Sequence, residues 1–277
     1  MDISAATVKA FRDKTGLPMM DCKRALVEAN GDEEKAIEIL RKAGAKTMAA
    51  RTDRETDSGR IALYADSAKQ VTAMVEILCE SPQVASAEEF IALANGLAEQ
   101  LATGPGANTP DELLAQPFPG KAGVTLREFF DDLVNKVRVV IQLTRIIRVE
   151  GPCGAYVHHN AAIGVLLPIE GDNVELGKDI AMHVASMQPF ALSESDLDPA
   201  VVQRERELIL SEVQETSKGK PENVIQKIVD GKMKAFLAER TLLGQPFVKD
   251  TAKTVTQVCE EGKIVVKKMI HWMLGQK

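Results

Sequence analysis

The sequence predicts an α+β protein in which a small helical domain precedes a core of antiparallel sheets, helices and a projecting helical hairpin. Three short amphipathic stretches with clear stop signals occupy residues 1–45. Farther along, β-branched runs and helical stretches are mixed and do not alternate as βαβ units. We expect a three-helix domain with its linker over residues 1–55, an N-terminal core subdomain over 56–150 and a C-terminal core subdomain over 151–277.

Glycine and proline divide the N-terminal domain into helices. Gly16 and Pro18 close the first helix, and a second helix starts near Met19. The apolar positions of residues 22–29 can face a core, whereas Lys23 points outward. A core this small is marginal, which favours docking over catalysis, and a plain three-helix bundle without a special surface is the alternative.

The third helix is predicted from its two ends. Asn30 and Gly31 end the second helix, and Asp32 can cap the next one. Acidic residues in its first turn and basic residues in its last turn suit the helix dipole, and Gly44 is expected to end it. The polar stretch over residues 46–59 is typical of a frayed helix end followed by a linker.

A β-hairpin and three helices are expected next. Residues 60–65 and 70–79 have the alternation of two paired strands with one buried face. Residues 87–102 carry apolar side chains at helical core spacing. Thr109 and Thr125 each begin a capping box, which predicts a short helix after residue 109 and a longer one to about residue 138.

Further strands are expected over residues 139–149, 155–158 and 163–169, with a helix over 174–187 and a last strand over 264–274. Asp198 with Pro199, and then Pro221, open two helices that end near residues 216 and 239. Their charged flanks favour a hairpin that projects over a pair packed within the core. The predicted seam between them consists of Leu208, Leu210, Val213, Val224, Ile228 and Met233.

Composition excludes several classes of protein. A net charge of -6 argues against direct nucleic-acid binding, because phosphate neutralisation needs a surplus of basic residues. No apolar run reaches the length of about 18 residues that a bilayer requires. The N-terminal residues lack secretory and transit features, so we expect a cytoplasmic location. The four cysteines stand singly, which predicts buried, reduced thiols.

Few residues are arranged for covalent chemistry. The chain has no GxxxxGK loop, so we expect it to hold no nucleotide cofactor of its own. His158 and His159, followed by Asn160, form the only histidine cluster, but further metal ligands and an adjacent nucleophile are missing. A solvated turn therefore competes with a functional site here, and a metal-dependent hydrolase is the weakest hypothesis.

Four ordered stretches resemble signatures of bacterial elongation factor Ts, namely FRDKTGLPMMDCKRAL from Phe11, GAYVHHN from Gly154, IAMHVA from Ile180 and GQPFV from Gly244. The likeness covers nearly the whole chain. It implies a UBA-like N-terminal domain and a role in protein–protein interaction during translation elongation, without enzymatic chemistry. The implied partner is elongation factor Tu, GDP-bound or nucleotide-free, whose GDP release would be promoted by disturbing its magnesium and phosphate site.

The resemblance also implies which residues meet that partner. Those of the first domain would grip the GTPase domain of elongation factor Tu, and those of the core would press against the flank of its nucleotide site. They are Arg12, Met19, Met20, Lys23, Ser81, Pro82, Gln83, Val84, His158 and His159. Which of the two adjacent histidines faces the partner stays open.

One departure from the family pattern concerns residues 81–84. The family carries Thr-Asp-Phe-Val there, and its phenylalanine wedges between helices of the partner, whereas this chain has Ser81-Pro82-Gln83-Val84. Glutamine cannot replace the apolar volume of an aromatic ring. We therefore expect docking to survive better than exchange, and the alternative is a non-exchanging binding or scaffold homologue.

A second departure from the family pattern lies near Val137 and Arg138, where the usual glycine is missing. Whether the 199–239 hairpin joins two copies in a homodimer or serves another partner stays open.

Overall fold

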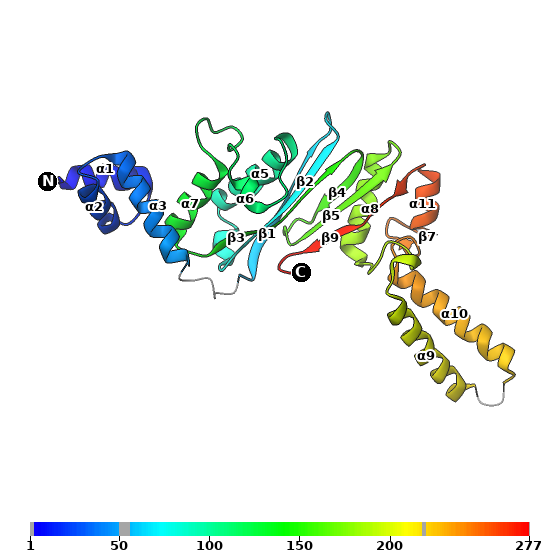
Figure 1. The fold of residues 1–277 in the computed structure, drawn as a ribbon. Helices are drawn as coiled ribbons and strands as arrows, with labels where there is room; N and C mark the ends of the chain where they lie inside the picture. Colours follow the sequence, from blue (N-terminus) through cyan, green and yellow to red (C-terminus); the bar gives the residue numbers. More distant parts are fainter. Residues whose placement is uncertain (1–2, 50–55, 218–219, 277) are drawn as a thin grey trace. The chain divides into compact units, whose positions relative to one another are not determined.

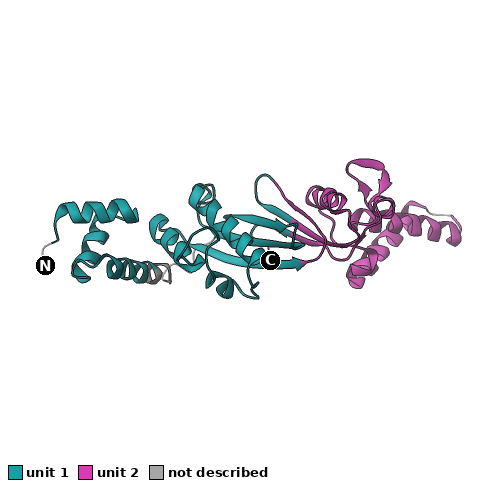
Figure 2. Cartoon of the chain, turned by 90° about the horizontal axis from the view of Figure 1, so that it is seen from above, with its two compact units in different colours: residues 1–149, 159–164, 272–277 teal, residues 150–158, 165–271 magenta. Residues whose placement is uncertain are grey.

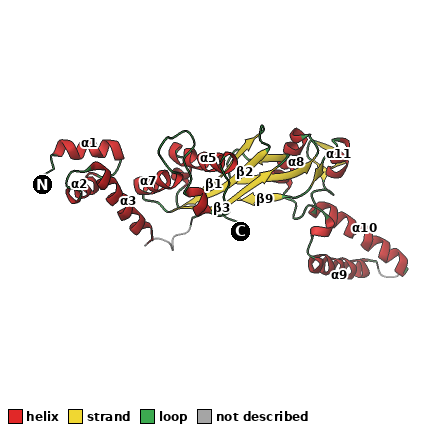
Figure 3. Ribbon diagram, turned by 45° about the horizontal axis from the view of Figure 1, so that its top comes forward, coloured by secondary structure: helices red, strands yellow, loops and turns green. Residues whose placement is uncertain are grey.

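The computed structural model describes residues 3–49, 56–217 and 220–276 and confirms a mixed α+β fold with antiparallel strand pairs (Figures 1 and 3). The chain divides into two compact units (Figure 2). Unit 1 comprises Met1–Val149, His159–Gly164 and Trp272–Lys277, and unit 2 comprises Glu150–His158 and Val165–His271. The division into regions 1–55, 56–150 and 151–277 stays a prediction.

The N-terminal helices form where the stop signals predict them: α1 (Ala5–Thr15), α2 (Met19–Glu28) and α3 (Glu33–Ala49). The Ser4 side chain caps α1 by accepting a hydrogen bond from the Thr7 N–H, and Gly16 ends it in the left-handed conformation with φ of 68°. The Asp32 carboxylate accepts from the Lys35 N–H at the start of α3. The three helices enclose a small apolar core: Val8, Phe11, Cys22, Ala25, Leu26, Ala29, Ala36 and Leu40.

α3 continues through Gly44 to Ala49, so the expected helix end at Gly44 is wrong. Gly44 instead permits a close approach to α7 (Leu126–Val137). A β-carbon built on Gly44 would lie 2.9 Å from Nδ2 of Asn135 and closer still to its Cγ and Oδ1. The missing side chain therefore serves helix packing, which a local stop signal does not reveal.

Unit 1 contains a three-stranded sheet in the order β1-β2-β3, with β1 (Ser58–Asp66), β2 (Val71–Cys79) and β3 (Ile141–Glu150). β1 and β2 form the predicted antiparallel hairpin, in register from Ser58 opposite Cys79 to Asp66 opposite Val71. The expectation of one buried face is wrong for β2, because all nine of its residues are buried. As the central strand, β2 has both of its faces covered.

Two different structures cover the faces of β2. α5 (Glu88–Thr103) packs on one face, where Ala73, Val75 and Ile77 join the main apolar core of unit 1. On the other face, Met74 and Ile61 lie against Gly164, whose β-carbon would come within 2.5 Å of the Met74 sulfur. The period-two pattern did not distinguish these two kinds of buried side chain.

The remaining helices of unit 1 are α4 (Pro82–Ala85), α6 (Pro110–Leu114) and α7, and both predicted capping threonines are at helix starts. Thr125 and Glu128 form a full capping box at α7. Thr109 caps α6 by accepting from the Glu112 N–H. The Glu112 carboxylate, however, accepts from the Asn108 N–H, so this second box is only half formed.

A four-stranded sheet contains β4 (Cys153–Val157), β5 (Ile163–Glu170), β8 (Val265–Val266) and β9 (Ile270–Met273), in the order β4-β5-β8 with β9 also paired to β5. In unit 2, α8 (Val174–Met187) packs on β4. There the backbones of Gly154 and Gly177 meet so closely that a β-carbon on Gly154 would lie 2.6 Å from Cα of Gly177. The short elements η1 (Glu194–Asp196), β6 (Pro246–Phe247), β7 (Asp250–Thr254) and α11 (Val255–Glu261) complete the unit.

The single strand expected over residues 264–274 is wrong, since β8 and β9 are separate. Ile264 and Val266 are buried with Val265 exposed between them, which fits strand alternation. Lys267 and Lys268 are both exposed, so the alternation fails at position 268, and Ile270 is buried again in phase with Val266. Two successive exposed lysines interrupt the strand.

α9 (Pro199–Thr216) and α10 (Glu222–Arg240) form the predicted hairpin, which extends from the rest of unit 2 (Figure 1). The predicted seam is right for Val213 and Met233 and partly right for Leu210 and Ile228. It is wrong for Leu208 and Val224, which are exposed. The buried positions are Ile209, Val213, Ile225, Val229 and Met233, spaced by four residues, and a position one residue away points about 100° around the helix.

Candidate partner-binding surfaces

The first candidate surface lies on α1 and α2. Met19 and Met20 are 40% and 68% exposed, and Arg12 and Lys23 are exposed as well. The opposite face of α2 explains this arrangement, because Cys22, Ala25 and Leu26 are buried in the small core. The predicted residues of the first domain are therefore solvated, with two thioethers and a cation on α2 and a second cation on α1.

One exposed residue of this surface, Val27, does not stand among the predicted residues. Val27 is 44% exposed on the same helix and follows Met20 by seven residues, which is two helical turns. The spacing of seven was the available signal, since it places both side chains on one stripe. The N-terminal patch is defined here as Arg12, Met19, Met20, Lys23 and Val27.

The second surface is the short helix α4, which directly follows β2. Pro82 and Gln83 are exposed, whereas Val84 packs against the main core of unit 1. The Ser81 hydroxyl donates to Oε1 of Gln83 at 2.7 Å, and the Ser86 hydroxyl donates to the Pro82 carbonyl at 3.0 Å. Residues 81–84 thus form a pinned helical turn that presents an amide and a proline ring.

Contacts at the base of α4 hold it in place. The Glu80 carboxylate accepts from the Val140 N–H at 2.9 Å, and the Glu80 N–H donates to the Val140 carbonyl. Arg60 donates to the Ala85 carbonyl at 3.3 Å. The turn is therefore tied to β1 and to the start of β3, so its position does not depend on its own short sequence.

The third surface is the histidine turn after β4. In unit 2, the Nδ1 atom of the half-buried His158 lies 3.0 Å from the Tyr156 hydroxyl. In unit 1, His159 is exposed, and the residues after it are held by backbone hydrogen bonds, including one from the Ile61 N–H to the Ala161 carbonyl at 2.7 Å. The two adjacent histidines thus have different surroundings.

His183 has a structural role in unit 2. Its side chain is fully buried, and its Nδ1 atom accepts from the Val248 N–H at 3.1 Å. The other ring nitrogen, Nε2, must then carry the proton and donate to Oε1 of Gln245 at 2.9 Å. Burial lowers the pKa of His183, because the charged form loses its hydration there.

The four cysteines are free and buried. Burial raises the pKa of the Cys79 thiol and raises that of Cys259 to about 11, so these two sulfurs stay protonated and weakly nucleophilic at neutral pH. Within the described ranges, histidine, cysteine and acidic side chains do not gather in groups of three or more that could hold a metal ion. Among those same residues, each helix is too short or too polar to cross a bilayer.

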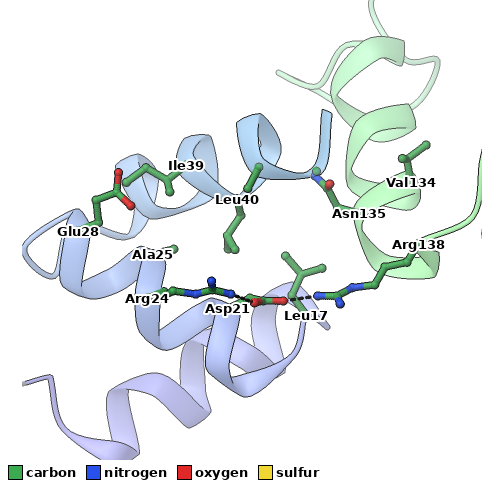
Figure 4. Close-up of a pocket in the computed structure, with 12 residues that line it drawn as sticks. Leu17, Asp21, Arg24, Ala25, Glu28, Ile39, Leu40, Val134, Asn135 and Arg138 are labelled. Carbon is green, nitrogen blue, oxygen red and sulfur yellow. Dashed lines mark hydrogen bonds and ion pairs between the residues drawn. The ribbon is translucent and has the colours of Figure 1, made fainter. Parts of the chain in front are cut away.

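Within unit 1, ion pairs connect the N-terminal helices to α7. Asp21 accepts from both Arg24 and Arg138 (Figure 4), and Arg41 donates to both carboxylate oxygens of Asp132 at 2.8 Å. A cavity of about 420 Å³ lies beside Asp21, with Leu17, Ala25, Leu40 and Val134 among its lining residues. These contacts hold the N-terminal patch on a fixed support.

Arg138 lies where the resemblance noted in the sequence predicts a nearby glycine. It ends α7 in the left-handed conformation with φ of 55°, and its N–H donates to the Val134 carbonyl. A side chain is strained in this conformation. The ion pair between Arg138 and Asp21 offsets part of that strain.

The structure keeps the predicted residues on three surfaces. The first group lies together on α1 and α2, the second on α4, and the histidines at the turn between β4 and β5.

Comparison with known proteins connects these surfaces to a family. A family model described as Elongation factor TS matches residues 80–276. The elongation factor Ts of Hydrogenobaculum sp. is 38% identical over 276 residues, covering 99% of this chain and 100% of that protein. That of Thioalkalivibrio sulfidiphilus is 37% identical over 279 residues, covering 100% and 93%, and that of Kineococcus radiotolerans is 38% identical over 278 residues, covering 98% of each.

The matches extend over the helical N-terminus and over both units, so the chain is a member of a family of translation elongation factors. The resemblance found in four short stretches is thereby confirmed along the whole chain. The chain belongs to the elongation factor Ts family.

Proposed function

We propose that this chain is a guanine nucleotide exchange factor for elongation factor Tu in the cytoplasm. It binds the GDP-bound and nucleotide-free partner and promotes GDP release by disturbing the magnesium and phosphate site, without covalent chemistry of its own. The observation that carries the proposal is the family match over 99% of the chain and 100% of a relative. The three exposed surfaces support it, because they offer side chains to a partner protein.

Nucleotide exchange of this kind depends on a difference in affinity for the empty and the GDP-bound partner. An exchange protein that binds the empty partner more tightly lowers the partner's affinity for GDP, and GDP lowers the partner's affinity for the exchange protein by the same ratio. An effect of about 10⁴-fold requires roughly 5.5 kcal/mol of difference between the two states of the partner. Contacts of equal strength in both states add affinity but contribute nothing to release.

The three surfaces divide naturally between these two tasks. The exposed methionines of the N-terminal patch can adapt to an apolar groove while Lys23 and Arg12 meet acidic groups, which supplies affinity. The α4 turn and the histidine turn are the surfaces proposed to discriminate between the states. Their backbones are held by hydrogen bonds, so contacts made there can change the conformation of the partner without changing that of these turns.

The test is release of fluorescently labelled GDP from elongation factor Tu with and without this chain. We expect faster release, and we expect Met20→Ala to raise the concentration needed for half-maximal acceleration. Met187→Ala is the matched control, since Met187 is a methionine of comparable exposure, 47%, on α8. His158→Ala and His159→Ala, measured separately, assign the histidine contact.

A second candidate function is a non-exchanging binding or scaffold protein for elongation factor Tu. The α4 turn favours it, because the exposed Gln83 provides no aromatic wedge there. A stable complex that releases labelled GDP no faster than the partner alone would support this second function and exclude exchange.

A further inference from the structure

A buried carboxylate on β2 holds the C-terminal residues of the chain. Glu76 is only 2% exposed, and each of its oxygens accepts two hydrogen bonds. Oε1 accepts from Arg145 Nη2 and from the Gly275 N–H at 3.0 Å. Oε2 accepts from Arg145 Nε at 2.8 Å and from the Thr144 hydroxyl at 2.5 Å. Only an acceptor at both positions satisfies this site, because a glutamine amide would point its hydrogens at two of these donors.

Arg145 provides a second hold on the same segment. Its Nη2 atom also donates to the Met273 carbonyl at 2.9 Å, and its guanidinium lies over the Trp272 ring, 4.6 Å from the centroid. Residues 272–275 are called the C-terminal strap below. The strap is thus tied to β2 and β3 through one ion pair, in which Glu76 is buried and Arg145 is partly exposed.

The strap in turn holds the turn that carries His159. Between its two anchored neighbours, Leu274 donates its N–H to the Ala162 carbonyl at 2.8 Å. On the other side, the Ile61 N–H donates to the Ala161 carbonyl at 2.7 Å. Ala161 has φ of 56°, a conformation that an alanine adopts only when its surroundings impose it. The shape of the turn therefore depends on β1 and on the strap.

We infer that Glu76 and Arg145 are positioning residues for nucleotide exchange. Through the C-terminal strap they fix the backbone of the His159 turn, which presents its exposed side chain to elongation factor Tu. The inference rests on the proposed function and deepens it, since it makes the ion pair of Glu76 with Arg145 and the C-terminal strap part of the exchange apparatus. Neither residue needs to touch the partner.

The experiment compares Glu76→Gln with Gln276→Ala in the full chain. Gln276 is an exposed residue next to the strap, and its backbone N–H bond to the Met273 carbonyl is kept in the control. Amide hydrogen exchange at Leu274, measured by NMR without partner, reports strap docking directly. We expect it to be roughly tenfold or more faster in Glu76→Gln, because buried donors lose their acceptor there, and unchanged in Gln276→Ala.

The functional arm uses labelled-GDP release. Glu76→Gln is expected to slow release by no more than His159→Ala does, and the double variant is expected to be no slower than His159→Ala alone, since both changes act through one turn. Losses that add would overturn the inference. So would a loosened strap with undiminished release, or Leu274 exchange that Glu76→Gln leaves unchanged.

Two further arrangements keep the result interpretable. If Glu76→Gln does not fold, Leu274→Pro removes the N–H that reaches the Ala162 carbonyl and restricts the backbone of the strap, while Glu76 and Arg145 are left unchanged. If the unaltered chain binds elongation factor Tu without speeding release, the exchange function fails by itself. Affinity for the partner then replaces GDP release as the readout for Glu76→Gln, His159→Ala and the double variant. Non-additive losses of affinity support the inference that the strap positions the turn, and additive losses overturn it.

Discussion

Replacing Gly154 by alanine should destabilise unit 2 far more than replacing Gly177, although the two glycines face each other. A β-carbon on Gly154 would lie 2.6 Å from Cα of Gly177 and closer still to its carbonyl group, and all of these are backbone atoms. A β-carbon on Gly177 would lie 3.0 Å from Cα of Gly154 and 3.2 Å from the Ile169 side chain. Neither glycine has a positive φ, so the difference is one of space alone.

The magnitudes follow from these distances. At Gly154, backbone must move to admit a methyl group, and overpacking of this kind costs about 3 kcal/mol or more. At Gly177, small shifts suffice, and alanine gains about 1 kcal/mol of helix propensity within α8, so the two effects nearly cancel. For a protein of this size, about 2–4 °C per kcal/mol gives a Tm lowered by about 6–12 °C for Gly154→Ala and changed by less than about 4 °C for Gly177→Ala.

Thermal unfolding followed by far-ultraviolet circular dichroism measures both variants. Gly231→Ala is the control, because Gly231 lies inside α10 with open space around its Cα, so alanine there is expected to raise the Tm by a few degrees. Equal shifts for Gly154→Ala and Gly177→Ala, or a larger loss at Gly177, would refute the reasoning from backbone contact.

Three further outcomes are expected. The pKa of His183 is lowered in the folded chain, so as pH falls through about 6.5 the unfolded chain takes up a proton that the folded chain does not, and stability present above that pH is lost below it. The urea midpoint should therefore fall less between pH 7.5 and 5.5 in His183→Gln than in the parent, and an equal fall in both would contradict this. Arg138→Gly relieves the left-handed strain while losing an exposed ion pair, so it should be more stable to urea than Arg138→Ala by about 1 kcal/mol, and the reverse order would exclude strain at this position. Val27→Asp should weaken binding to elongation factor Tu in calorimetric titration without changing the Tm, whereas unchanged affinity would remove Val27 from the N-terminal patch.

The candidate surfaces were predicted from sequence to different extents. The exposed methionine pair, the buried face of α2 and the position of His159 after β4 all follow from local patterns, and their exposure agrees with the structure. The role of these residues toward a partner came from resemblance, because the local pattern around an exposed side chain does not say which other protein it contacts. Val27 was missed although its spacing from Met20 was visible, since a single exposed valine is ordinary.

The errors in the predicted fold have a common origin. Gly44 was expected to end a helix, but it packs on Asn135, which is distant in the chain. The seam of α9 and α10 was predicted one residue out of phase at Leu208 and Val224, because apolar residues surround enough of each helix to leave the buried stripe undetermined. In each case the deciding contact came from another element.

Sequence alone determined the helix starts and most strand positions of this protein, because caps, stops and hydrophobic periods act between residues a few positions apart. Asp198 at α9, Thr125 with Glu128 at α7 and Gly16 after α1 are of this kind. Tertiary structure alone decided that both faces of β2 are buried and that Glu76 collects donors from β3 and from the strap. These contacts join residues far apart in sequence, and their energy depends on burial and hydrogen-bond partners that exist only once the chain has folded.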